Sequence, residues 1–180
     1  MNPMCCIAGI LACLLMAGYH GHRLHAKETA ASTDSPELTR DTGLRTNRGL
    51  LALYEFHATE GHIVKDTAGV GRPLNLKIDD LSAVRRFDGS LEVQGETLIA
   101  SKQPPSRLVA SLQRTGEITI EAWIQTAGLS QKGPARIVSL SRNGSSRNFT
   151  LGQDGGQLDV RLRTTETSGN GLPSLSSTQG

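Results

Sequence analysis

The stretch Gly116-Glu117-Ile118-Thr119-Ile120-Glu121-Ala122-Trp123-Ile124-Gln125 alternates apolar and polar side chains along its length. A period of two is typical of a half-buried β-strand, because successive side chains of a strand point to opposite faces. We therefore predict a strand that turns its isoleucines to the core and Trp123 to the other side. Gly116 marks where this strand starts.

Further strands are predicted on both sides of this stretch, at residues 50–56, 73–78, 84–87, 90–93, 97–101, 135–141, 148–153 and 157–164. Asp88-Gly89 and Asp154-Gly155-Gly156 have the composition of tight hairpin turns. One helix is predicted after Pro105, with Ser106 as its N-cap and Gly116 at its end. Many short strands with frequent turns and a single helix predict an all-β, two-sheet antiparallel sandwich.

The last predicted strand also alternates clearly. We predict that it turns apolar side chains to the core and charged side chains to solvent. The inward set is Leu158, Val160 and Leu162, and the outward set is Asp159, Arg161 and Arg163.

Residues 1–26 are predicted to be a signal peptide or a membrane anchor. Residues 4–18 are almost entirely apolar, and such a helix is too short to cross a bilayer core of about 30 Å comfortably but is typical of an export signal. Leu24-His25-Ala26 offers a cleavage site, and Cys13 offers a lipidation site. Cleavage, retention and lipidation all stay open, and each would place the protein outside the cytoplasm.

Residues 27–48 are rich in Thr, Ser and charged residues. This composition predicts a flexible linker, because it cannot bury enough apolar surface to offset the entropy of ordering. The folded domain is expected over residues 49–180. The three cysteines, Cys5, Cys6 and Cys13, precede it, so the domain holds no disulfide of its own.

Several motifs follow one another in the order seen in a known family. They are Leu53-Tyr54-Glu55-Phe56, Asp66-Thr67-Ala68-Gly69, Phe87-Asp88-Gly89, Ile118-Thr119-Ile120-Glu121-Ala122-Trp123-Ile124, Arg136-Ile137-Val138 and Phe149-Thr150-Leu151-Gly152. Together they resemble laminin G-like jelly-roll domains of the concanavalin A-like lectin and glucanase superfamily. The resemblance implies a two-sheet jelly roll that is exported and that serves as a binding or adhesion module.

The chain departs from this family at its end. Such domains continue with strands that close both sheets, whereas residues 168–180 are rich in Ser, Gly and Thr. We therefore expect a C-terminally truncated, partial laminin G-like domain. Apolar faces and strand edges left open would make it poorly stable or self-associating.

No catalytic constellation is found. Glu117 and Glu121 share a strand face, but four residues along a strand separate their backbones by about 13 Å. Retaining glycosidases place their carboxyl groups about 5–5.5 Å apart and inverting ones about 6.5–9.5 Å. Asp79 and Asp80 would point to opposite faces. We expect a non-catalytic protein, and a partial or degenerate glycoside hydrolase-like domain is the alternative.

The candidate ligand-binding residues are Trp123, Arg161 and Arg163. An exposed Trp123 would stack on a sugar ring, although the matching position in the family fills space beneath a loop. Arg161 and Arg163 form a basic stripe that suits an acidic glycan. The expected partners are an extracellular glycan or protein, and the alternative is a structural spacer without a ligand.

No cofactor is expected, and calcium is the alternative. Asp66, Asp88 and Asp154 lie in predicted turns and could supply oxygen ligands. The net charge of +2 comes from charges of mixed sign along the chain, so no surface for nucleic acid is predicted. Contact with a membrane is expected only through the N-terminal segment, if it is uncleaved.

Overall fold

The computed structural model describes residues 10–16, 49–130, 132–133 and 135–177. The predicted cleavage site, the linker at 27–48 and the ends of the predicted export segment lie outside these residues, so they stay predictions. Among the described residues, no helix is long and apolar enough to cross a bilayer.

The described chain forms antiparallel sheets with one α-helix, which confirms the all-β prediction. The first sheet contains β1 (Ile10–Met16), β2 (Leu50–Tyr54), β5 (Val84–Phe87), β6 (Ser90–Val93) and β8 (Thr119–Ile124). The second contains β9 (Ala135–Ser141), β10 (Arg147–Asp154), β11 (Gln157–Leu162) and β12 (Leu175–Ser176). The third contains β3 (Ile63–Val64), β4 (Leu76–Ile78) and β7 (Ile99–Ala100).

Both predicted hairpins form. Strands β5 and β6 meet at Phe87 and Ser90 across Asp88-Gly89, with Gly89 at a φ of 81° that a residue with a Cβ rarely adopts. Strands β10 and β11 meet at Asp154 and Gln157. The turn chemistry therefore fixed both registers.

The predicted helix forms as α1 (Ser106–Thr115), after a 3-10 turn η1 (Leu81–Ala83) and strand β7. It ends as expected, because Gly116 takes the left-handed conformation and donates its N–H to Leu112 O. The N-cap prediction was wrong. Pro105 holds that position without a side-chain hydrogen bond, and Ser106 is the first helical residue.

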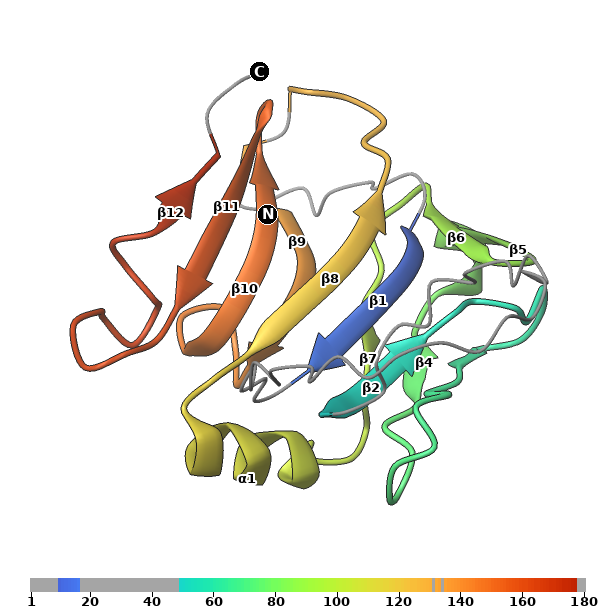
Figure 1. Cartoon of the computed structure of the whole chain (residues 1–180). Coiled ribbons are helices and arrows are strands. Elements are labelled where there is room, and N and C mark those ends of the chain that lie inside the picture. Colours follow the sequence, from blue (N-terminus) through green and yellow to red (C-terminus); the bar gives the residue numbers. More distant parts are fainter. Residues whose placement is uncertain (1–9, 17–48, 131, 134, 178–180) are drawn as a thin grey trace, which may run out of the picture.

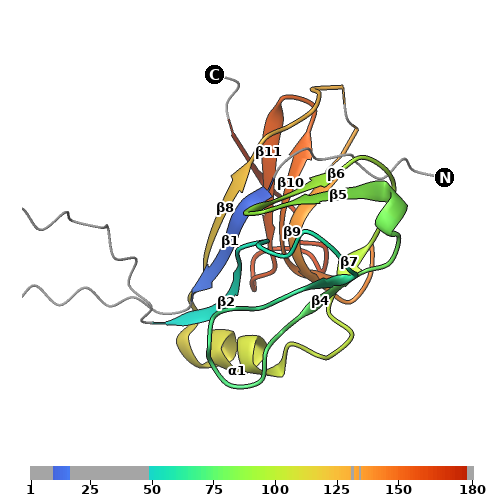
Figure 2. The same ribbon diagram turned by 90° about the vertical axis from the view of Figure 1, so that its right-hand side faces the viewer.

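The core joins residues of all three sheets and α1. Ile118 and Ile120, from the alternating stretch 116–125, pack with Val138 and Leu140 against the core cluster that contains the buried Phe149. Figure 1 shows β8 and β1 in front of β9, and the turned view of Figure 2 separates them into different layers. The central stretch thus turns Ile118 and Ile120 toward the core, as predicted.

The apolar N-terminal run differs from its prediction as a helix. Within it, Ile10–Met16 forms strand β1, which pairs with β2 on one side and with β8 on the other. A continuous apolar run fits a buried strand as well as a buried helix, so periodicity alone does not separate the two. The run forms a strand here because β2 and β8 would otherwise each present an edge whose backbone groups need hydrogen-bond partners.

Strand β11 has the predicted alternation but not the predicted exposure. Leu162 and Val160 are ladder partners of Phe149 and Leu151, so they lie on the core side of the sheet. They are nevertheless 43% and 41% exposed, whereas Asp159 on the opposite face is only 6% exposed. Among the described residues, nothing covers the apolar side at this edge, whereas the charged side is covered by another part of the chain.

Candidate functional site

Charged side chains gather on the outer face of the second sheet. Strand register places Arg161 opposite Thr150 and Asp159 opposite Gly152. Two β-bulges, at Arg147/Phe149 and at Leu151/Gly152, add Arg147 and Arg136 to the same face. We call Arg136, Arg147 and Arg161 the arginine cluster.

One member of the arginine cluster is neutralised. Arg161 Nε lies 2.8 Å from Asp159 Oδ1 and donates a hydrogen bond to it. The side chains of Arg161 and Asp159 are 14% and 8% exposed, so the pair is largely shielded from water. Beside it, the Ser139 and Thr150 hydroxyl oxygens lie 2.8 Å apart in a hydrogen bond that links β9 to β10.

The other two members share a single acceptor. Arg136 Nη2 and Arg147 Nη2 both donate to the carbonyl oxygen of Gly144, at 3.2 and 3.1 Å. Arg147 is only 8% exposed, and its Nε and Nη1 are buried without a hydrogen-bond partner in the described structure. Two like charges that converge on one carbonyl repel each other, and buried donors without acceptors cost further free energy.

The electrostatics of Arg147 follow from this arrangement. Burial lowers the pKa of Arg147, and the neighbouring charges of Arg136 and Arg161 lower it further. Asp159 raises the pKa of Arg147, but it also pairs with Arg161. With three cations and one anion, the cluster has an uncompensated positive charge.

A C-terminal segment covers the cluster. Gly169 O accepts a hydrogen bond of 3.0 Å from the backbone N–H of Arg147. A Cβ on Gly171 would lie 3.0 Å from Arg161 Cβ, so the segment lies directly against β11. Between these two residues, Asn170 Oδ1 is also buried without a partner. Residues 168–171 are thus the covering segment of the site.

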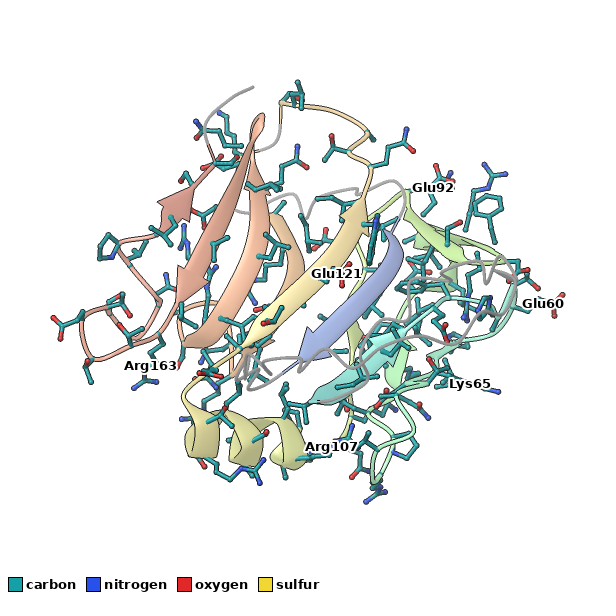
Figure 3. All side chains as sticks on the ribbon, in the orientation of Figure 1. Glu60, Lys65, Glu92, Arg107, Glu121 and Arg163 are labelled. Carbon is teal, nitrogen blue, oxygen red and sulfur yellow. The ribbon has the colours of Figure 1, made fainter. Side chains whose placement is uncertain are left out.

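The structure separates the residues predicted to bind a ligand. Arg161 belongs to the arginine cluster, but Arg163 lies beyond the end of β11 and is exposed (Figure 3). Arg161 is half-buried and paired with Asp159, whereas Arg163 is exposed, so the basic stripe of Arg161 and Arg163 stays a prediction. Trp123 lies in the other sheet, on β8, where it is half-buried.

Sequence reasoning missed Arg136 and Arg147. A strict period of two does not place them on the face of Arg161, because each is brought there by a bulge. Arg142–Ser146 forms the turn that supplies Gly144 O, with Asn143 Oδ1 accepting the backbone N–H groups of Ser145 and Ser146. The Asn-Gly-Ser sequence of that turn was the available signal.

The three carboxylates proposed for calcium take separate partners. Asp88 Oδ1 pairs with His57 Nδ1 at 2.8 Å, and Asp154 Oδ1 accepts the N–H of Gly133. Asp66 accepts backbone N–H groups in a turn. Nowhere in the described part of the chain do three His, Cys, Asp or Glu side chains converge as a metal would require.

Asp66 is the centre of a second buried charge arrangement. Its carboxylate accepts the backbone N–H groups of Leu53, Ala68 and Leu74 at 2.8–3.1 Å and the guanidinium of Arg107 at 3.3 Å. Arg107 also donates to the carbonyl oxygens of Leu51 and Arg72. These bonds tie β2, the loop after β3 and α1 together, which explains the Asp66-Thr67-Ala68-Gly69 motif as a structural turn.

A pocket of about 210 Å³ lies beside this arrangement, between α1 and the loop before β4. Its lining includes Leu51, Leu74, Pro104 and Arg107. The guanidinium of Arg107 already donates to carbonyl groups and to Asp66. The pocket therefore has fewer free hydrogen-bond donors for a ligand than the arginine cluster has.

Comparisons with protein-family models, curated proteins and solved structures find no match to this chain.

Proposed function

We propose that this protein is a non-catalytic binding module that takes an acidic glycan at the arginine cluster. One observation carries the proposal. Arg136 and Arg147 converge on a single carbonyl oxygen, while two buried donors of Arg147 have no acceptor within the part of the chain that the structure describes. A ligand oxyanion would supply both the missing negative charge and the missing acceptors.

The chemistry of the ligand follows from the guanidinium group. Its planar array of donors matches a carboxylate or a sulfate, and it is more weakly hydrated than an ammonium group. Uronic acids and sulfated sugars both carry such groups. To reach Nε and Nη1 of Arg147, the ligand has to displace part of the covering segment, residues 168–171.

The proposed scaffold is a partial laminin G-like jelly roll that is exported. The resemblance of the motifs supports it, as do the antiparallel sheets and the core formed between β8 and β9. The exposed apolar residues Val160, Leu162 and Leu175 show that the described residues leave one apolar face of this proposed sandwich uncovered. Leu175 is the ladder partner of Val160, so the three form one continuous apolar surface.

Isothermal titration calorimetry on the full chain tests this function. The probes are a sulfated uronate oligosaccharide, an unsulfated uronate oligosaccharide and a neutral oligosaccharide of equal length. We expect both acidic probes to bind and the neutral one not to bind. If only the sulfated probe binds, the recognised group is the sulfate.

Arg147→Met and Arg163→Met form a matched pair for this experiment. Methionine keeps an apolar stem of similar length but removes the charge. We expect Arg147→Met to weaken binding at least about tenfold, since a close buried charge contact is worth 2 kcal/mol or more. Arg163→Met should change affinity less than about twofold. Equal losses in the two variants would overturn the proposal by placing the binding outside the arginine cluster. No binding by the wild type would overturn it in favour of a spacer.

A further inference from the structure

Strands β2 and β8 flank a gap that is one strand wide. In the described part of the chain, each of them has β1 as its strand neighbour and no direct ladder to the other. Without β1, both edges would present unpaired backbone N–H and C=O groups, which is the condition under which a sheet accepts an added strand.

Both walls of this gap are held by contacts that do not involve β1. On the β2 side, Leu53 N–H donates to Asp66, and the carbonyl oxygen of Leu51 accepts from Arg107. On the β8 side, Ile120 packs against the core, and Gly116 caps the preceding helix. The walls are therefore set by the rest of the domain, and the occupant adds to a site that already has its shape.

The occupant is an uncharged apolar segment of this chain. Residues Ile10–Met16, with the sequence ILACLLM, pair antiparallel with both walls at once. Leu14, for example, is the ladder partner of Leu53 on one side and of Glu121 on the other. This run is also the centre of the predicted export segment, residues 4–18. One segment cannot lie in a membrane, or be cleaved away, and at the same time complete the sheet.

We infer that the gap between β2 and β8 is a strand-binding site that the chain's own Ile10–Met16 blocks in cis. Export through this segment and closure of the sheet then compete for the same residues. A chain that loses the segment exposes the site, and an uncharged apolar strand supplied in trans fits it.

A disulfide trap in the full chain tests the cis occupant. Cys13 and Ala122 are ladder partners, and directly opposite residues have Cα atoms about 4.5–5.5 Å apart. That separation lies within the range of about 4.4–6.8 Å that a disulfide spans. In a Cys5→Ser, Cys6→Ser background, Ala122→Cys should form an intramolecular disulfide with Cys13 on mild oxidation. Glu121→Cys, opposite Leu14, is the matched control and should not.

Non-reducing gels and intact mass give the result. A predominant monomer about 2 Da lighter than the reduced chain supports the inference, because closing one disulfide removes two hydrogens. A disulfide-linked dimer, or equal cross-linking of the control, overturns it.

A second experiment tests acceptance in trans. Leu14→Pro removes a backbone donor from the middle of β1, which should expel the strand without changing either wall. A fluorescent peptide of residues 9–17, flanked by lysines for solubility, should then bind this variant at least tenfold more tightly than the wild type. Equal affinity for the two proteins would contradict a site that is blocked in cis.

Discussion

Arg107 is half-buried and Arg147 is buried, but the two guanidinium groups differ in the hydrogen-bond acceptors that they reach. Arg107 reaches the Asp66 carboxylate and two backbone carbonyl oxygens. The guanidinium of Arg147 has one hydrogen bond, to a carbonyl oxygen that it shares with Arg136, and two buried donors that meet no acceptor among the described residues. The first arginine is part of the framework of the fold, and the second has binding capacity that the fold does not use.

The largest loss of stability is expected when Asp66 is replaced. Asp66→Ala removes the acceptor of three backbone N–H groups and of Arg107, in a side chain only 2% exposed. We expect the free energy of unfolding in urea to fall by about 3–5 kcal/mol, the cost of leaving a buried charge unpaired. Asp79→Ala, at an exposed carboxylate, is the control and should cost less than about 0.5 kcal/mol. A loss at Asp66 no larger than at Asp79 would show that these bonds do not hold the fold.

A smaller effect is expected at the covering segment. Gly171 has a φ of 70°, and a Cβ there would lie 3.0 Å from both Arg161 Cβ and Leu162 N. Gly171→Ala should therefore lower the free energy of unfolding by about 1–2 kcal/mol through backbone strain and crowding. Gly169→Ala meets no atom within 4 Å. It is the control, and a loss at Gly169 equal to that at Gly171 would contradict the close approach of the segment to β11.

Arg147→Met should have little effect on stability when no ligand is present. The change removes one shared hydrogen bond and also a buried charge that nearby arginines repel. We expect the free energy of unfolding to change by no more than about 1 kcal/mol, with either sign, because replacing an unsatisfied buried charge by an apolar group is often neutral or stabilising. If the free energy of unfolding fell by more than about 2 kcal/mol, Arg147 would stabilise the fold as Arg107 does, which would contradict this expectation.

The smallest effect concerns an ion pair on the surface. A hydrogen bond from His57 to Asp88 raises the pKa of His57, and the charges of Asp88 and Glu55 act in the same direction. The pair therefore favours the folded state below the unfolded pKa of about 6.5, and this contribution disappears as pH rises through the higher folded pKa. An NMR titration should show a raised pKa that moves back toward 6.5 in Asp88→Asn. An unchanged pKa in that variant would exclude the pair as the cause.

The sequence predicted the fold class and the two hairpins because local signals control them. The Asp-Gly turns and the alternation around Ile118 and Ile120 depend on neighbours in the chain, and they persist in the structure. The exposure of β11 could not be predicted, since it depends on a covering segment that lies beyond the strand. The arginine cluster was missed for a related reason, because the bulges that assemble it reset the period of two.

The apolar N-terminal run shows a second limit of sequence reasoning. Its composition satisfies an export helix and a buried strand equally, and the choice depends on two distant edges, β2 and β8. Nothing within the run itself signals that those edges are vacant. At β1, as at Arg147, the outcome depends on hydrogen-bonding groups elsewhere in the fold that need partners. The sequence of the segment alone does not reveal them.

The linkage between ligand binding and stability at Arg147 tests the anion-binding role of the arginine cluster most directly. The free energy of unfolding of wild type and Arg147→Met would be measured in urea with and without the sulfated uronate oligosaccharide. The ligand concentration would be 100 times the dissociation constant that calorimetry gives. We predict a gain of about 2.7 kcal/mol for the wild type, as mass action requires for a ligand that binds the folded state, and a gain of no more than about 1.4 kcal/mol for Arg147→Met, whose affinity is at least tenfold lower. An equal gain in both proteins would show that the ligand binds elsewhere, and no gain in either would contradict the anion-binding role of the cluster.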